Sequence, residues 1–406
     1  MPPLRLVLAS RLGRLPGVST VTAAPHRHSL ATLESYEPCE SRREHRNVPA
    51  IPYVAFPLVN PPRIREVLTT VFRLATLRAL RQELIEVRIT IPDDYQDAVR
   101  GLKAFSKLAG HDVTIYNDST RDPSLLAQRF ADADALVLIR ERTAITEDLL
   151  VQLPRLKIIS QTGRGTAHID LAACTRHGVI VTVGTGSPVA PAELTFALIL
   201  SAMRRIPTEV TQLRAGKWQT TLGRALRGRT LGIWGYGKIG SLVAGYGRAF
   251  GMNVLAWGRE GSLGRASRDN VNTAPDRETL LEQSDVLSLH LKLNDETKGM
   301  IRENDLFRMK PDSLLVNTSR AELIAPGALL QALRNGRPGY AALDVYEEEP
   351  MPPSHPLLTM ANVLCTPHLG YVEKDSYELY FGEAFDQILA FANGDRMNAI
   401  NRAGGV

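Results

Sequence analysis

Short runs of apolar, often β-branched residues alternate with helix-like patterns from Val87 onward. The first runs are apolar at almost every position, as expected of strands buried on both faces of a parallel sheet. The segments between them, such as Tyr95–Ala109 and Pro123–Ala131, have the periodicity of helices. The pattern predicts a first α/β layer of about five strands, at Val87–Ile91, Asp112–Tyr116, Ala135–Ile139, Leu156–Ser160 and Val179–Val183.

A long apolar helix and a second alternating set follow. Pro188 suits a helix start, and Ala192–Ile206 is apolar on most sides, so we expect this helix to be buried between domains. Arg204 and Arg205 are expected in its last turn, where cations suit the helix dipole. A further helix is predicted at Ser376–Asn393. The second set matches a doubly wound nucleotide-binding sheet, with strands at Thr230–Trp234, Asn253–Trp257, Asp285–Leu291, Ser313–Asn317, Tyr340–Val345 and Asn362–Cys365.

The 406 residues exceed one ordinary domain, so we expect two domains and a basic leader at residues 1–86. Residues 1–85 contain 12 arginines, no lysine and 6 acidic residues. This composition resembles a mitochondrial transit peptide. A disordered leader, or translation assigned upstream of the true start, is the alternative that the proline clusters favour. We expect a cytoplasmic protein, or a mitochondrial one if residues 1–30 act as a transit peptide.

Composition argues against several classes of function. The net charge of +5 is concentrated in the leader, and the nearly neutral remainder does not support nucleic-acid binding. No apolar run reaches the length of about 18 residues that a membrane span needs. Cys39, Cys174 and Cys365 stand singly, without metal-ligand spacing, so we expect neither a disulfide framework nor a metal site.

A glycine-rich turn follows the first strand of the second set. Residues 235–240 read Gly-Tyr-Gly-Lys-Ile-Gly, between a predicted strand and a predicted helix. Gly235 permits a tight turn, Gly237 lets the backbone approach a pyrophosphate, and Gly240 allows the helix to pack closely on the strand. The sequence therefore predicts a dinucleotide site at Gly235, Tyr236, Gly237, Lys238, Ile239 and Gly240.

The end of the next strand bears on which nicotinamide cofactor is used. NAD-specific sites carry Asp or Glu there to bind the ribose 2′-hydroxyl group. This chain has Gly258 followed by Arg259, which suits a 2′-phosphate group. We therefore favour NADP(H), with Arg259 as a binding residue. NAD(H) remains an alternative because Glu260 could still bind the ribose.

Three residues with complementary chemistry follow late strands of the second set. Arg320, Glu349 and His368 come at or just beyond strand ends, where ligands bind in open α/β sheets. A guanidinium group can bind the carboxylate of a 2-keto acid and polarise its carbonyl group. Histidine exchanges protons near physiological pH, and a carboxylate on its other ring nitrogen fixes the tautomer. Each residue alone could be structural, but together they predict a catalytic set.

Five motifs occur in order along the chain: residues 235–240, His290–Thr297, Met309–Arg320, Ala342–Pro350 and Thr366–His368. In order and spacing they resemble the D-isomer-specific 2-hydroxyacid dehydrogenases. The resemblance implies hydride transfer between NAD(P)H and a small 2-keto or D-2-hydroxy acid, with hydroxypyruvate and glyoxylate first and phosphoglycerate next. Arg320 would bind substrate, Glu349 would pair with the histidine, and His368 would be the acid–base.

The resemblance also implies an architecture of two doubly wound parallel-sheet domains with a cleft between them. A flavodoxin-like substrate domain would combine residues 87–184 with 370–406, and residues 185–369 would form a Rossmann NAD(P)-binding domain. Family members are usually homodimers, with the region around residues 188–206 near the interface. Asp344 matches a frequent acidic position, which we place in the cofactor-binding set with a structural or pKa-tuning role.

Two loops of the first predicted domain could contact substrate. Arg140 and Arg142 follow a strand and could bind a phosphate or a second carboxylate, or could form ion pairs within their own loop. Gly163 and Gly165 lie where backbone N–H groups could reach the substrate carboxylate, unless this loop is only a turn. Two rival functions share the fold: an NAD(H)-sensing transcriptional corepressor, and a formate dehydrogenase, for which we find no positive sign.

Overall fold

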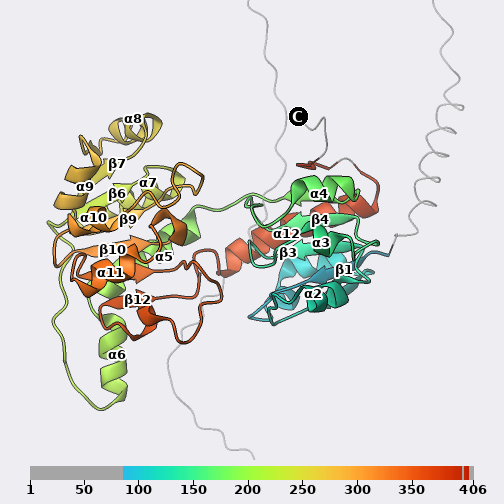
Figure 1. Cartoon of the computed structure of the whole chain (residues 1–406), viewed down its shortest axis with the longest axis horizontal. Coiled ribbons are helices and arrows are strands. Elements are labelled where there is room, and N and C mark those ends of the chain that lie inside the picture. The colour runs from blue at the N-terminus through green and yellow to red at the C-terminus, as the bar shows by residue number, and fades with distance from the viewer. Residues whose placement is uncertain (1–85, 396, 402–406) are drawn as a thin grey trace, which may run out of the picture. The chain divides into compact units, whose positions relative to one another are not determined.

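The first sheet is built from the apolar runs that follow Val87 (Figure 1). The computed structural model describes residues 86–395 and 397–401, so almost all of the expected leader lies outside the described residues. The strands pair in parallel in the order β2-β1-β3-β4-β5. They are β1 (Arg88–Ile91), β2 (Asp112–Ile115), β3 (Ala135–Leu138), β4 (Ile158–Gln161) and β5 (Ile180–Val183). β3 and β4 are buried at every position, because both faces of the sheet are covered.

Polar residues begin the helices of this layer. Asp122, Thr146 and Asp170 each accept a hydrogen bond from a backbone N–H of the first turn. They precede α2 (Pro123–Phe130), α3 (Glu147–Leu150) and α4 (Leu171–Arg176). The single helix predicted at Tyr95–Ala109 is wrong, since two 3-10 helices, η1 (Val99–Gly101) and η2 (Lys103–Leu108), occupy this stretch. Leu102 interrupts them because it is extended (φ −75°, ψ 142°) and its side chain is buried in the core.

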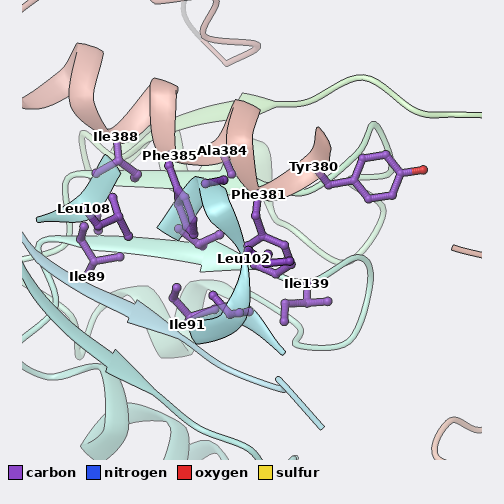
Figure 2. Close-up of a cluster of buried hydrophobic side chains, with 14 of the residues drawn as sticks. Ile89, Ile91, Leu102, Leu108, Ile139, Tyr380, Phe381, Ala384, Phe385 and Ile388 are labelled. Carbon is purple, nitrogen blue, oxygen red and sulfur yellow. The ribbon is translucent and has the colours of Figure 1, made fainter. Parts of the chain in front are cut away.

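The C-terminal helix packs on this first sheet, although most of the chain separates the two in sequence. α12 (Lys374–Ala392) contributes Phe381, Phe385 and Ile388 to one buried cluster with Ile89 and Ile91 of β1. Figure 2 shows these side chains between the helix and the strands. The last described residues also join this sheet, because the N–H of Ile400 donates to the carbonyl oxygen of Val181 at 2.9 Å.

The second sheet is also parallel throughout, in the order β12-β11-β10-β9-β6-β7-β8. Six of its strands were predicted: β6 (Thr230–Trp234), β7 (Asn253–Trp257), β9 (Val286–Leu289), β10 (Leu314–Asn317), β11 (Tyr340–Leu343) and β12 (Val363–Cys365). The unpredicted strand is β8 (Asn272–Thr273), whose two residues are both exposed and so leave no apolar run. Two parallel α/β sheets confirm the predicted fold class.

The long apolar helix is shorter than predicted. α5 (Val189–Met203) ends before Arg204 and Arg205, because Arg205 adopts a left-handed conformation (φ 58°) and a separate helix, α6 (Ile206–Arg214), begins after it. α5 buries Phe196, Ile199 and neighbouring side chains in a core shared with β6 and α7. The remaining elements are α7 (Lys238–Ala249), α8 (Glu260–Arg268), α9 (Arg277–Gln283), α10 (Glu303–Phe307), η3 (Ala321–Leu323), α11 (Ala328–Arg334) and η4 (Pro356–Thr359). Within the described ranges, no helix is both long and apolar enough to cross a membrane.

Candidate active site

The glycine-rich turn joins β6 to α7. Gly235 has a φ of 100°, and a Cβ atom there would lie 2.5 Å from the carbonyl oxygen of His290. A Cβ atom at Gly240 would collide with the carbonyl oxygen of Gly235. At Gly237, by contrast, no described atom beyond the chain neighbours lies within 4 Å of the Cβ position. Gly237 is the N-cap of α7 and offers no side-chain cap, so open space and uncapped N–H groups fit a pyrophosphate here.

Tyr236 contributes backbone to this turn, because its side chain is engaged elsewhere. Its phenol donates to Asp269 Oδ2 at 2.8 Å, and its N–H donates to Ser262 Oγ at 2.7 Å. Burial and the bond to Asp269 raise the pKa of Tyr236 to about 12. The side chain of Arg265 also lies against the turn, because its Nε donates to the Tyr236 carbonyl oxygen at 3.0 Å. Arg265 was not among the residues predicted from the sequence.

The three predicted catalytic residues follow neighbouring strands. Arg320 follows β10, Glu349 follows β11 and His368 follows β12, and these strands are adjacent in the sheet. Because parallel strands end at one edge, the three residues reach the same side of the sheet. His368 Nδ1 lies 2.6 Å from Glu349 Oε2, and Oε1 of that carboxylate accepts from the N–H of Tyr346 at 2.9 Å. Nε2 of His368 has no hydrogen-bond partner among residues 86–395 and 397–401.

Asp344 anchors the loop that carries the histidine. It is fully buried, and its Oδ1 accepts from the hydroxyl of Thr366 at 2.6 Å and from the N–H of Leu369 at 2.7 Å. Its Oδ2 accepts from the N–H of Gly370 at 2.9 Å. Burial raises the pKa of Asp344, although these bonds and the nearby His368 oppose that rise. The contacts favour the structural role over direct cofactor binding.

Arg320 pairs with Glu141, which was not predicted as a site residue. Its Nη2 lies 2.9 Å from Glu141 Oε1, and its Nη1 donates to the carbonyl oxygen of Ser319 at 2.7 Å. Burial opposes ionisation of Glu141, but the charges of Arg320 and Arg140 outweigh it and hold the pKa of this carboxyl below its ordinary value. Glu141 therefore carries a negative charge at neutral pH.

The glycine loop of the first sheet makes room for two long side chains. Cβ atoms at Gly163 and Gly165 would collide with the guanidinium group of Arg140 and the carboxylate of Glu141. Arg142 instead donates through Nη1 to the carbonyl oxygen of Asp93 at 2.5 Å. The structure thus brings Gly163 and Gly165 together with Arg140 and Glu141. The missing side chains of the two glycines let Arg140 and Glu141 lie close to the backbone of this loop.

Two cavities meet at the histidine. One, of about 520 Å³, is lined by Glu141, Arg142, Glu349 and Tyr371 among others. The other, of about 330 Å³, is lined by Gly237, Lys238 and Ile239 of the glycine turn and, among others, by His290 and Arg320. Arg140, His368 and Tyr371 line both cavities. Of the described residues, no group of three or more His, Cys, Asp or Glu side chains is arranged to hold a metal ion.

Two further lining residues were not predicted as part of the site. His290 directly follows β9 and lies 2.9 Å from the Ser288 hydroxyl through Nε2, and burial lowers its pKa to about 4, so the ring is neutral. Tyr371 sets its ring edge-on to that of His368, with centroids 5.5 Å apart, and burial raises its pKa so that the phenol stays protonated. The strand-end rule that identified Arg320 would also have found His290.

Fold and site together define a nicotinamide-dependent oxidoreductase with an arginine, a carboxylate and a histidine at the strand ends. Comparison with known proteins names the family. A family model described as the NAD-binding domain of D-isomer specific 2-hydroxyacid dehydrogenases matches residues 196–370. A glyoxylate reductase of Aeropyrum pernix is 40% identical over 311 residues, which cover 72% of this chain and 90% of that protein. The chain belongs to the D-isomer specific 2-hydroxyacid dehydrogenase family.

Solved structures agree. The crystal structure of a putative D-3-phosphoglycerate dehydrogenase from Ralstonia solanacearum is 55% identical, with a TM-score of 0.77, covering 78% of this chain and 97% of that one. A D-lactate dehydrogenase from Aquifex aeolicus, complexed with NAD and lactic acid, is 31% identical with a TM-score of 0.60, covering 76% and 96%. The predicted family and enzyme class, acting on CH–OH donors with a nicotinamide cofactor, are therefore confirmed, and nothing in these comparisons favours the corepressor alternative.

Proposed function

We propose that Arg320, Glu349 and His368 form the active site for reduction of a 2-keto acid. The observation that carries this proposal is the 2.6 Å bond between His368 Nδ1 and Glu349, at a histidine that lines the same cavity as Arg320. A reduced nicotinamide dinucleotide, held through its pyrophosphate at the glycine turn, would supply the hydride for C2. His368 gives its Nε2 proton to the carbonyl oxygen, and Glu349 stabilises the protonated ring beforehand. Arg320 binds the carboxylate and polarises the carbonyl group.

For the substrate, hydroxypyruvate and glyoxylate are the first candidates and 3-phosphoglycerate the next. The relatives support this group: besides the glyoxylate reductase, a D-3-phosphoglycerate dehydrogenase of Bacillus subtilis is 39% identical over 272 residues. The chain spans about half of the length of that second protein (51%), so the comparison concerns part of it. Arg140 and the backbone near Gly163 and Gly165 are proposed to border the substrate.

NADP(H) is the cofactor that we favour. Arg259 is exposed at the N-cap of α8, directly after β7 and Gly258. Arg265 on the same helix bonds to the glycine turn, so two guanidinium groups flank the region where a 2′-phosphate would lie. Glu260 is the one acidic residue in the first turn of α8, which keeps NAD(H) as the alternative.

The domain boundaries and the homodimer are also proposals. The core that α12 shares with β1 supports a substrate domain made of residues 87–184 and 370–406, with residues 185–369 as the cofactor domain. α6 supports the dimer, because none of its residues is buried although Ile206, Val210 and Leu213 recur at helical spacing. The predicted location, cytoplasmic or mitochondrial through residues 1–30, stays a prediction.

The first experiment follows the loss of nicotinamide absorbance. We expect the purified protein to oxidise NADPH, and NADH less efficiently, with at least one of hydroxypyruvate, glyoxylate, pyruvate and 3-phosphohydroxypyruvate. His368→Asn should lower kcat by roughly 100-fold or more, because it removes the proton donor, while the dissociation constant of the dinucleotide changes little.

The matched control is His177→Asn. His177 also pairs with a glutamate, Glu147, through Nε2 at 3.0 Å, but it lines neither of the two cavities described above. It should keep near-full activity. Tight dinucleotide binding without turnover of any keto acid, or full activity in His368→Asn, would contradict the proposed function.

A further inference from the structure

Glu141 is the unexpected charge in the pocket. It lies between Arg140 and Arg142 in the loop after β3, and its side chain is only 24% exposed. Its carboxylate occupies the space above the Cα atom of Gly165 and lies 2.9 Å from Arg320. Glu141 therefore stands beside the guanidinium group that we assign to the substrate carboxylate.

The two neighbouring arginines keep their charge but lie against other groups of the protein. Arg142 donates to the carbonyl oxygen of Asp93 and stacks over the ring of Tyr95, 4.2 Å from its centroid. Arg140 lies over Gly163, and the ring centroid of Tyr371 is 5.2 Å from its guanidinium carbon. The charge of Arg140 is partly offset by the adjacent Glu141, and Arg140 in turn helps to lower the pKa of that carboxyl.

The acidic residues that line the larger cavity have separate tasks. They are Glu141 and Glu349, and Glu349 is bound to His368. Glu141 is thus the carboxylate whose charge acts on the substrate. Once a substrate carboxylate binds Arg320, this guanidinium group has two anionic neighbours, and the charge of Glu141 would repel a further anion on the substrate in a partly buried space.

We propose that Glu141 is a specificity residue that restricts the enzyme to 2-keto acids with a single negative charge and rejects those with an additional phosphate or carboxylate. This inference rests on the proposed function and narrows its substrate class. It opposes the alternative in which Arg140 and Arg142 form a site for a substrate phosphate.

The test compares substrates that differ in one anionic group. We expect the wild-type protein to have a higher kcat/KM for hydroxypyruvate than for 3-phosphohydroxypyruvate, and for pyruvate than for oxaloacetate. Glu141→Gln keeps the shape of the side chain and removes the charge. It should raise kcat/KM for the more anionic member relative to its partner by roughly tenfold, the scale expected for one unit charge a few ångströms away.

Two variants separate charge from structure. Glu141→Asp keeps the charge and should retain the wild-type ratio. Glu147→Gln is the matched control, because Glu147 pairs with Arg176 and His177 and lines neither cavity, and it should leave the ratio unchanged.

Two results would overturn the inference: a wild-type preference for the more anionic substrates, or a folded Glu141→Gln variant that alters both members of a pair equally. The second result would mean that Glu141 only positions Arg320. If Glu141→Gln does not fold, as judged by circular dichroism, the wild-type and Glu141→Asp ratios decide. Failure of the proposed function is distinguishable, because it removes turnover of every keto acid or leaves His368→Asn active.

Discussion

At the residue scale, two carboxylates hold His368, the proposed acid–base, by different bonds. Glu349 bonds the imidazole ring itself, whereas Asp344 bonds the backbone N–H groups of Leu369 and Gly370, just after His368. His368 has a φ of 52°, a conformation that non-glycine residues rarely adopt. The buried bonds to Asp344 stabilise the loop in which that conformation occurs. Glu349 thus sets the tautomer of the His368 ring, and Asp344 sets the position of the loop that carries it.

Arg259 gives a residue-scale prediction about cofactor choice. Arg259→Asp replaces a partner of the 2′-phosphate by a carboxylate that binds a ribose 2′-hydroxyl group and repels phosphate. We expect the ratio of kcat/KM for NADPH to that for NADH to fall by at least about tenfold, roughly 1.4 kcal/mol. Arg268→Asp, the same charge change at the other end of α8, is the control. An unchanged ratio in Arg259→Asp would remove this residue from the cofactor site.

Candidate site residues could be predicted from the sequence where they come directly after a predicted strand. Arg320, Glu349 and His368 stand after strands and could be found from the sequence. Glu141 also follows a strand, but an acidic residue between two arginines has the pattern of a local ion-pair loop. Its partner Arg320 is 179 residues away, and only the folded chain brings the two together.

At the scale of elements, errors arose where one residue interrupts a periodic pattern. The apolar spacing continues through Leu102 and through Arg205, yet the backbone leaves the helical conformation at both. Tertiary packing of Leu102 overrides the local preference for a continuous helix. β8 was missed for a different reason. It is an edge strand of two exposed residues, so no apolar run indicates it in the sequence.

The turn between β6 and α7 gives an element-scale prediction. Gly237→Val places methyl groups in open space, so the free energy of unfolding should stay within about 1 kcal/mol of wild type. The same groups block the approach of a pyrophosphate, so dinucleotide affinity should fall at least about tenfold. Gly240→Val must displace the carbonyl oxygen of Gly235 and should cost about 2 kcal/mol of stability.

Urea denaturation and isothermal titration calorimetry with NADPH measure the two effects. The pair of variants serves as its own control, since the substitution is the same and the positions are three residues apart. Normal NADPH affinity in Gly237→Val would mean that the cofactor does not approach this part of the turn.

At the scale of the whole molecule, α6 presents apolar surface with no partner in the described chain. Ile206, Val210 and Leu213 are 47%, 41% and 57% exposed, and Trp218 and Leu222 in the following segment are 77% and 97% exposed. Apolar side chains gathered in this way mark an interface between proteins. In the proposed homodimer, a second copy of this chain covers this apolar surface.

We predict that sedimentation equilibrium gives twice the 44.6 kDa chain mass. Val210→Lys combined with Leu213→Lys charges one face of α6 and should shift the protein to monomer, with a circular dichroism spectrum like that of wild type. Leu379→Lys, at a comparably exposed apolar position on α12 (41%), should remain dimeric. A monomeric wild-type protein would exclude the homodimer.

The sequence by itself determined every described strand except β8, the glycine turn and the three residues proposed for catalysis, because these depend on local apolar runs and on positions just after strands. Only the tertiary structure decided where helices break, what Arg320 pairs with and which side chains hold the histidine loop. Those features arise from contacts between residues that are far apart along the chain. The folded environment also sets the charge of site residues. Burial keeps His290 neutral, and neighbouring arginines keep Glu141 ionised.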